Sequence, residues 1–229
     1  MNDLSVLKEI PDPLADAPAP MESPLPLPRF IGAAPVRRET RGRRAAALAV
    51  SLAWLSTHLV VYGIRNDFAR LPAEYLALQI ALPALLGAGS LLLAVAPGKL
   101  GLGLSAGIVT SLAVLGPLSF GLVALGVRAP AAAVSGDDFW LGSLVCLDIT
   151  LAWVAAPLLL AAWTLRRAFP AVAGWRSALV GAALGLLSGA AINLHCPSAD
   201  PAHLLAGHGV PIVVATLVGG LVLSRWARA

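Results

Sequence analysis

Charged residues are scarce in this chain of 229 residues: they make up 12% of it, whereas hydrophobic residues make up 58%. Soluble domains usually carry about 25% charged residues, and a soluble chain of this length could not bury so much apolar surface. Uncharged runs of roughly 20 residues, the length that crosses a bilayer as a helix, recur along the chain. The composition therefore excludes a soluble globular protein and predicts a helical membrane protein.

Cysteine is also scarce, and the motifs of common enzyme classes are absent. Two cysteines do not build a disulfide scaffold. The sequence has no nucleophile–base–acid arrangement, no phosphate-binding loop and no paired catalytic carboxylates. The glycines of segment 101–104 follow no predicted strand, as a dinucleotide-binding fingerprint would require. We therefore expect that the protein is not an enzyme.

Six apolar segments alternate with polar turns, which predicts six transmembrane helices. The expected helices lie near residues 45–62, 74–95, 100–125, 139–164, 178–194 and 204–223. Residues 1–35 are dense in proline, which opposes a continuous helix and favours disorder. The predicted fold is all-α. It consists of a disordered Pro-rich tail with a basic juxtamembrane segment, residues 1–44, followed by a polytopic six-helix membrane bundle, residues 45–229.

Basic residues predict how this bundle is oriented in the lipid bilayer. Six crossings place both termini on one side of the membrane. Arg65, Arg70 and Arg128 then lie on the opposite side, and the other 13 of the 16 lysines and arginines lie with the termini. The positive-inside rule makes the side of the termini cytoplasmic. The arginines of segment 36–44 fit this juxtamembrane position and are not interleaved with aromatic residues, so we expect no direct nucleic-acid binding.

This topology places every cysteine and histidine of the chain in the outer half of the bundle. They are His58, Cys146, His195, Cys196, His203 and His208. Cys146 and Cys196 fall at similar depth, and three interpretations stay open. The thiols form a disulfide in an oxidising compartment, they bind a thiophilic metal or react with an oxidant, or they are small buried hydrophobic residues.

The remaining candidates for a ligand cluster are His58, Asp148, His195, His203 and His208. Histidine nitrogens together with cysteine sulfur suit zinc or copper. Asp148 is the one acid inside an apolar run, which makes it a functional candidate, and a hydrated position or a pair with His58 is the alternative. His203 and His208 are five residues apart, so on one α-helix they point to different faces. The spacing is not diagnostic, and no cofactor is certain beyond this candidate metal ion.

Two further patterns concern binding and packing. Leu4, Leu7 and Ile10 form a short apolar face in the tail, which predicts a segment that folds on binding a partner; an idle linker is the alternative. The glycines of the fifth predicted helix recur every four residues and predict a helix-packing seam, and a similar pattern lies in the third. The two sets are Gly181, Gly185 and Gly189, and Gly101, Gly103 and Gly107.

Several of these features together resemble the NrsF-type and CarR-like six-helix transmembrane anti-sigma factors. The features are Cys146 in the fourth helix, the basic segment 165–170, the Gly-rich fifth helix, and His195-Cys196-Pro197 before segment 207–211. The resemblance implies a bacterial inner-membrane protein whose cytoplasmic N-terminal segment holds an extracytoplasmic-function (ECF) sigma factor. A stimulus sensed in the membrane or at its outer face then releases the sigma factor, either by rearrangement or with the help of a membrane protease. The paired cysteines, Cys146 and Cys196, look like the sensing element.

A different class of function stays open as the alternative. The outer histidines and cysteines are also consistent with a membrane redox or transport protein that binds haem or metal. Proteins that carry electrons across a membrane place haem ligands at both depths, whereas all four histidines here lie on one side. This asymmetry favours the regulator over the redox protein.

Overall fold

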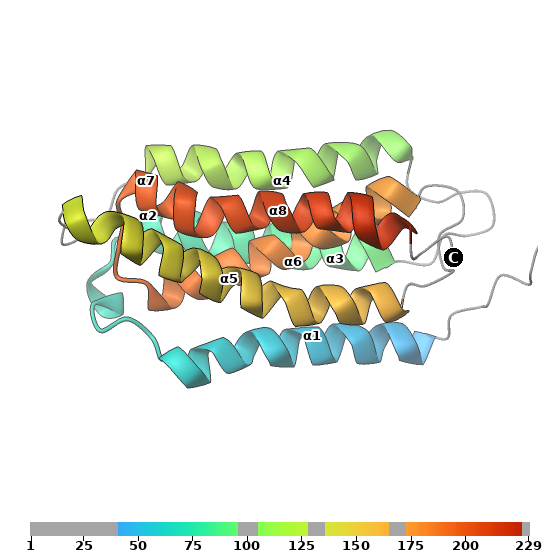
Figure 1. Ribbon diagram of the computed structural model, residues 1–229, viewed down its shortest axis with the longest axis horizontal. Helices are drawn as coiled ribbons and strands as arrows, with labels where there is room; N and C mark the ends of the chain where they lie inside the picture. The colour runs from blue at the N-terminus through green and yellow to red at the C-terminus, as the bar shows by residue number, and fades with distance from the viewer. Residues whose placement is uncertain (1–40, 96–104, 128–135, 165–172, 226–229) are drawn as a thin grey trace, which may run out of the picture. The chain divides into compact units, whose positions relative to one another are not determined.

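The computed structural model describes residues 41–95, 105–127, 136–164 and 173–225, and every regular element within these ranges is helical. The tail residues Leu4, Leu7 and Ile10 lie outside them. The long helices run side by side along one axis (Figure 1). In chain order the elements are α1 (Arg41–Tyr62), η2 (Phe68–Arg70), α2 (Ala73–Tyr75), η3 (Leu76–Ala81), α3 (Leu82–Val95), α4 (Ala106–Gly126), α5 (Gly136–Thr164), α6 (Ala173–His195), α7 (Pro201–His203), η4 (Leu204–Gly209), α8 (Val210–Val218) and η5 (Gly219–Leu223).

The predicted all-α fold is confirmed for these residues. Elements α2, η3 and α3 follow one another without a break, as do α7 to η5, so the six predicted helices are all present. The third predicted helix begins later than expected, at Ala106, where the Ser105 hydroxyl caps it by accepting from the Ile108 N–H at 3.3 Å. The fifth is longer than expected, because α6 already begins at Ala173.

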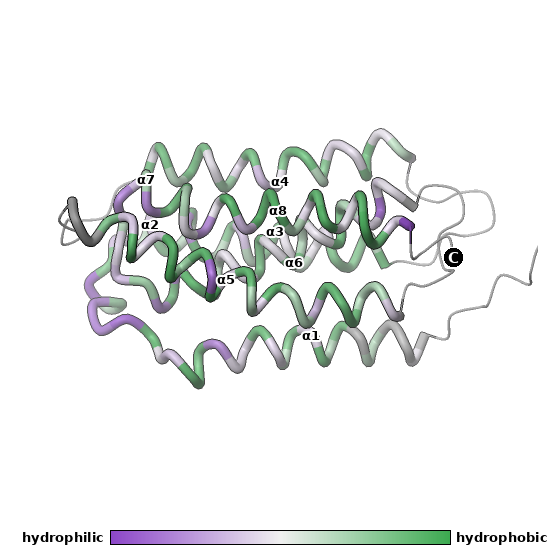
Figure 2. Tube along the Cα trace, viewed as in Figure 1, coloured by the Kyte–Doolittle hydropathy of each residue, from purple (hydrophilic) through white to green (hydrophobic). Residues whose placement is uncertain are grey.

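The outer surface of the bundle is apolar, as a bilayer requires. Within the described ranges five helices are long and apolar enough to cross a membrane, namely Ala73–Val95, Ala106–Gly126, Phe139–Trp163, Gly174–His195 and Pro201–Leu223. The apolar part of α1, Leu48–Tyr62, is shorter. Figure 2 shows hydrophobic residues along the helices and hydrophilic ones around the turn after α1 and the beginning of α7. The protein is therefore a membrane protein.

Helix α6 forms the centre of the bundle. Over an 18-residue stretch of its span 83% of the residues are buried, against 22–33% in the corresponding stretches of the other four candidate spans. It contacts α1, α3, α4, α5 and α8, whereas α1 packs mainly against α5 and α6. Because α6 is rich in glycine and alanine, the surrounding helices can approach its backbone closely.

The glycine seam predicted on the fifth helix is confirmed as a packing surface. A Cβ atom at Gly181 would lie 2.1 Å from the carbonyl oxygen of Ala215, and one at Gly185 would lie 2.9 Å from the Cα of Ile212. These glycines thus let α6 and α8 touch backbone to backbone. Of the third helix's glycines, Gly101 and Gly103 lie outside the described residues. Gly107 is exposed, with only the Ser105 hydroxyl oxygen near it, so it does not form such a seam.

We expect Gly181→Ala to destabilise the protein by about 1–3 kcal/mol or more, because the added methyl group forces α6 and α8 apart. Gly89→Ala is the matched control, since a Cβ there meets nothing within 4 Å. It should be neutral or stabilising by up to about 1 kcal/mol through helix propensity. Thermal unfolding in mild detergent measures both variants. Equal effects at the two glycines would contradict the packing role of the seam.

Candidate functional site

His203 and His208 lie side by side at one end of the bundle, although the sequence predicted that they point to different faces. Their ring centroids are 5.4 Å apart, with the planes at 81°. The prediction was wrong because it assumed an α-helix. Residues Leu204–Gly209 form a π-helical segment, in which one hydrogen-bonded turn spans five residues instead of four. A separation of five residues therefore brings both imidazoles to the same face.

Proline explains why polar groups gather near η3 and η4, two of the π-helical segments. Pro83 follows η3 and Pro211 follows η4, and proline has no N–H to donate to the carbonyl four residues earlier. Of those carbonyls, at Gln79 and Gly207, the first accepts from a side chain instead, since Asn193 Nδ2 donates to Gln79 O at 2.8 Å. The Thr150 hydroxyl lies 3.5 Å from Gly207 O, although its shorter hydrogen bond, of 2.6 Å, goes to Cys146 O.

Four soft or nitrogen ligands from three helices meet at this end of the bundle. Cys146 comes from α5, Cys196 follows α6, and His203 and His208 belong to the last helix. The two Sγ atoms are 3.7 Å apart, and Cys196 Sγ is 3.3 Å from His203 Nε2. One ligand atom of each residue lies within 4.8 Å of all the others, which is close enough to hold a metal ion. We call these four residues the Cys–His cluster.

Hydrogen bonds on the far side of each imidazole fix how the histidines face the cluster. Ser143 Oγ is 3.2 Å from His203 Nδ1, and Asn193 Oδ1 contacts His208 Nδ1. Because Asn193 must present its NH₂ group to the carbonyl of Gln79, its oxygen faces His208. His208 Nδ1 therefore carries the proton, and Nε2 is left with a free lone pair.

The cluster is buried at the edge of the membrane-spanning part. Cys196, His203 and His208 are 4%, 2% and 0% exposed. Both cysteines are free thiols, since a disulfide needs sulfurs about 2.05 Å apart. Cys196 lies between two spans. The hydrogen bond from the Cys146 S–H holds the pKa of the Cys196 thiol below its usual range, although burial acts in the opposite direction.

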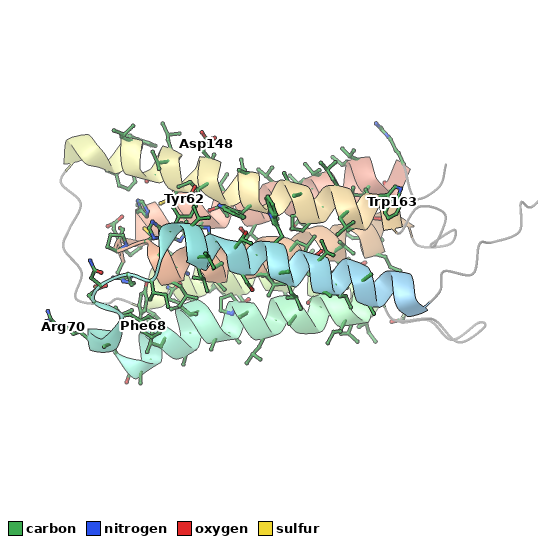
Figure 3. The ribbon with its side chains drawn as sticks, turned by 90° about the horizontal axis from the view of Figure 1, so that it is seen from below. Tyr62, Phe68, Arg70, Asp148 and Trp163 are labelled. Atoms are coloured by element: carbon green, nitrogen blue, oxygen red, sulfur yellow. The ribbon has the colours of Figure 1, made fainter. Side chains whose placement is uncertain are left out.

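The other predicted ligands lie nearby but not in the cluster. His58 is buried on α1, and its ring is 5.9 Å from His195 and 5.5 Å from Trp153. Nε2 of His58 has no hydrogen-bond partner among the described residues. Asp148 is exposed on the side of α5 that faces away from the other helices (Figure 3), so it does not pair with His58.

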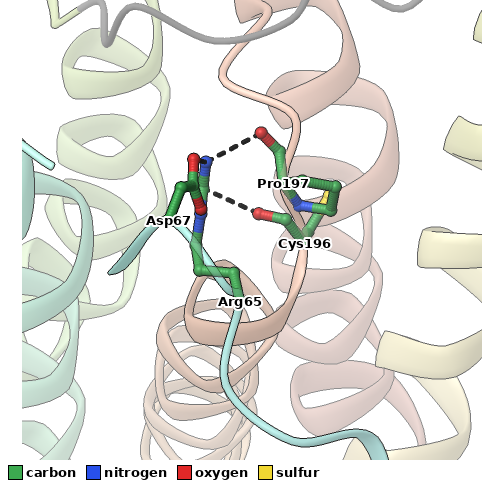
Figure 4. A network of polar contacts seen from close by, with 4 residues as sticks. All are labelled: Arg65, Asp67, Cys196 and Pro197. Carbon is green, nitrogen blue, oxygen red and sulfur yellow. Dashed lines mark hydrogen bonds and ion pairs between the residues drawn. The ribbon is translucent and has the colours of Figure 1, made fainter. Parts of the chain in front are cut away.

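Arg65, for which the sequence predicted only a place in an outer loop, connects the end of α1 to the cluster (Figure 4). Its side chain is buried and donates to the carbonyls of Cys196 and Pro197, both at 2.8 Å. It also pairs with Asp67 through hydrogen bonds of 2.6 and 2.8 Å, which hold the pKa of that carboxyl below its usual value. Its backbone N–H donates to Leu194 O at 2.9 Å. We call these contacts the Arg65 clamp.

Comparison with known families now adds to this geometry. A family model described as NrsF, negative regulator of sigma F, matches residues 31–228. The chain belongs to the NrsF family. The match includes all the described helices and the Cys–His cluster, and it makes this chain a negative regulator of a sigma factor. The tail residues Leu4, Leu7 and Ile10 precede the matched segment. No curated protein and no solved structure matches the chain.

Sequence reasoning on this NrsF-family chain gave no role to Ser143, Asn193, Gln79 or Thr150. Each is a polar residue inside an apolar run, and such residues usually find a partner in a neighbouring helix. That signal was present in the sequence. What it could not reveal is which partner each would find, because that depends on how the helices pack and, for Asn193, on the proline that frees the carbonyl of Gln79.

In this NrsF-family protein we expect Arg65→Ala to lower the free energy of unfolding by about 1–3 kcal/mol, because the buried carbonyl of Cys196 loses its donor, and the more exposed carbonyl of Pro197 loses one too. Arg70→Ala, an exposed change in the same loop, should stay within about 0.5 kcal/mol. The ion pair between Arg65 and Asp67 contributes part of this free energy of unfolding. That contribution is fully present above the ordinary carboxyl pKa of about 3.9 and is lost as the pH falls through the lowered pKa of Asp67. Unfolding in detergent across this pH range measures it. An Arg65→Ala protein as stable as Arg70→Ala would contradict the clamp.

Proposed function

We propose that this chain is a membrane-bound anti-sigma factor that sequesters an ECF sigma factor through its cytoplasmic N-terminal segment. A stimulus sensed at the outer face of a bacterial inner membrane releases the sigma factor. The family match across the helical bundle carries this proposal. The proposal gives the chain a regulatory role rather than an enzymatic one, and it gives the outer thiols Cys146 and Cys196 the role of sensor.

The layout of α1 supports a division between a sensing end and a binding end. His58 lies next to the cluster end, and α1 begins 17 residues earlier at Arg41. At 1.5 Å per residue this distance is about 26 Å, most of the hydrocarbon thickness of a bilayer. The segment 1–44 therefore leads into α1 at the end remote from the cluster. The excess of lysine and arginine on the side of the termini supports a cytoplasmic location for both termini.

Contacts of α1 suggest how the two ends communicate. The Arg65 clamp joins the end of α1 to the carbonyls of Cys196 and Pro197. Within α1, Trp54 Nε1 donates to Trp153 O of α5 at 3.0 Å, and His58 packs against Trp153. A change of ligand or oxidation state at Cys196 would shift these contacts, and α1 would carry the shift toward the tail. A membrane protease that recognises the shifted state is a partner consistent with this route.

The tail supplies the contacts for the sigma factor in this proposal. Leu4, Leu7 and Ile10 recur every three residues and would present one apolar face to a groove of the partner when the segment becomes helical. Ordering such a segment costs free energy, which limits its affinity in solution. Attachment to the membrane raises the effective concentration and offsets part of this cost.

Deletion of residues 1–35 should release the sigma factor and switch its target genes on without a stimulus. The triple change of Leu4, Leu7 and Ile10 to alanine should have the same effect, because it removes the apolar face. Transcript levels of the target genes, with recovery of the sigma factor on the purified protein, measure the outcome.

The matched control changes the polar residues Asn2, Ser5 and Lys8 to alanine, at the same spacing in the same segment. It should keep repression intact. Unchanged repression after deletion of residues 1–35, with the protein still inserted in the membrane, would contradict sequestration by the tail. Equal effects of the two triple variants would contradict the apolar anchors.

A further inference from the structure

We propose that the Cys–His cluster is a four-coordinate binding site for a thiophilic divalent cation of the zinc type. The ligands are Cys146 Sγ, Cys196 Sγ, His203 Nε2 and His208 Nε2. This inference deepens the sensing role and rests on the proposed function for its regulatory consequence. The binding of the metal itself does not depend on a sigma factor.

His208 is the first reason to infer a ligand. Its side chain is fully buried, and Nε2 has no hydrogen-bond partner among the described residues. Asn193 Oδ1 accepts only and occupies Nδ1, so Nε2 holds an unused lone pair that points toward the cluster. A buried polar atom without a partner is costly. A cation coordinated by Nε2 would remove that cost.

The hydrogen bonds to the other ring nitrogen of each histidine are the second reason to infer a metal site. Histidines that bind metals usually donate their other ring nitrogen to a fixed acceptor, which sets the tautomer and the ring orientation. His203 has Ser143 Oγ in that position, and His208 has Asn193 Oδ1, which is held in turn by the carbonyl of Gln79. Both rings are therefore oriented before a metal arrives.

The distances are the third reason. Zinc–sulfur bonds of about 2.3 Å and zinc–nitrogen bonds of about 2.0–2.1 Å, at tetrahedral angles, place two sulfurs about 3.8 Å apart and a sulfur and a nitrogen about 3.6 Å apart. The observed separations are 3.7 Å between the sulfurs and 3.3 Å between Cys196 Sγ and His203 Nε2. The widest pair of ligand atoms, within 4.8 Å, needs a shift of roughly 1 Å or more to close around an ion.

Charge decides which class of cation fits. Binding forms two metal–sulfur and two metal–nitrogen bonds and releases the two thiol protons to solvent, so a divalent ion with two thiolates and two neutral imidazoles carries no net charge. A neutral complex suits a buried site, where an uncompensated charge is expensive. The four ligands include no carboxylate, which disfavours calcium and magnesium. Two sulfurs and two nitrogens in a tetrahedron favour zinc or its close relatives.

The test uses the full-length protein purified in detergent under reducing conditions, with Zn²⁺ as the ligand and Co²⁺ as the spectroscopic probe. We expect one Zn²⁺ per chain and, with Co²⁺, the spectrum of a tetrahedral site with thiolate ligands. His203→Ala and His208→Ala should each weaken binding by more than the roughly 10- to 100-fold that loss of an outer-shell partner costs. Asn193→Ala should fall within that 10- to 100-fold range. His195→Ala is the matched control and should bind as the wild type does, because its ring faces His58 and Tyr62 instead.

Two outcomes would overturn the inference. One is wild-type protein that binds no Zn²⁺ while its cysteines are reduced. The other is Zn²⁺ binding that depends on Cys146 and Cys196 but is unchanged in both histidine variants. A sensor that works only through a disulfide predicts the first pattern, with oxidation by diamide intact in His203→Ala. Loss of repression on tail deletion is scored separately in cells, so failure of the metal site and failure of the anti-sigma function remain distinguishable.

Discussion

The close approach of helix backbones to α6 is the constraint on which the rest of the structure depends. With little driving force from apolar burial inside a bilayer, helices associate through close packing and interhelical hydrogen bonds. Gly181 and Gly185 let α8 touch the α6 backbone, and the buried face of α6 is otherwise made mostly of alanine and leucine. With α6 in the centre, its C-terminal end comes between α5 and the last helix. Cys196, just beyond that end, therefore meets Cys146 and His203.

Polar contacts at this end follow from the same arrangement. Pro83 and Pro211 free two carbonyls inside apolar helices; Asn193 of α6 satisfies that of Gln79, and the Thr150 hydroxyl of α5 lies 3.5 Å from that of Gly207. Asn193 thereby connects the packing of three helices to the tautomer of His208. A buried network of this kind is favourable only when each member is satisfied. His208 Nε2 and Gln79 Oε1 both lack a partner among the described residues, and the metal inference centres on His208 because it is the one that belongs to the Cys–His cluster.

Much of the fold followed from the sequence, whereas the site followed only in part. Hydropathy predicted six helices because apolar length is a direct requirement of the bilayer. The similar depth in the membrane expected for Cys146 and Cys196 also predicted that the two cysteines would be close. The pairing of His203 with His208 did not follow, because it needs a π-helical turn that α-helical spacing excludes. Asp148 was a candidate ligand because of its charge alone. Its place on the outward side of α5 depends on how that helix is rotated about its axis, and the nearly uniform hydrophobicity of the α5 sequence does not indicate this rotation.

In the proposed function the Cys–His cluster faces the outside of the cell while the tail lies inside. Single cysteines introduced as Asn66→Cys, in the exposed turn beside the cluster, and as Ser5→Cys, in the tail, test this arrangement in a background with Cys146→Ser and Cys196→Ser. A membrane-impermeant maleimide is applied to cells whose inner membrane is intact. The account predicts labelling at position 66 before permeabilisation and at position 5 only afterwards. Labelling of both positions from the same side would contradict it.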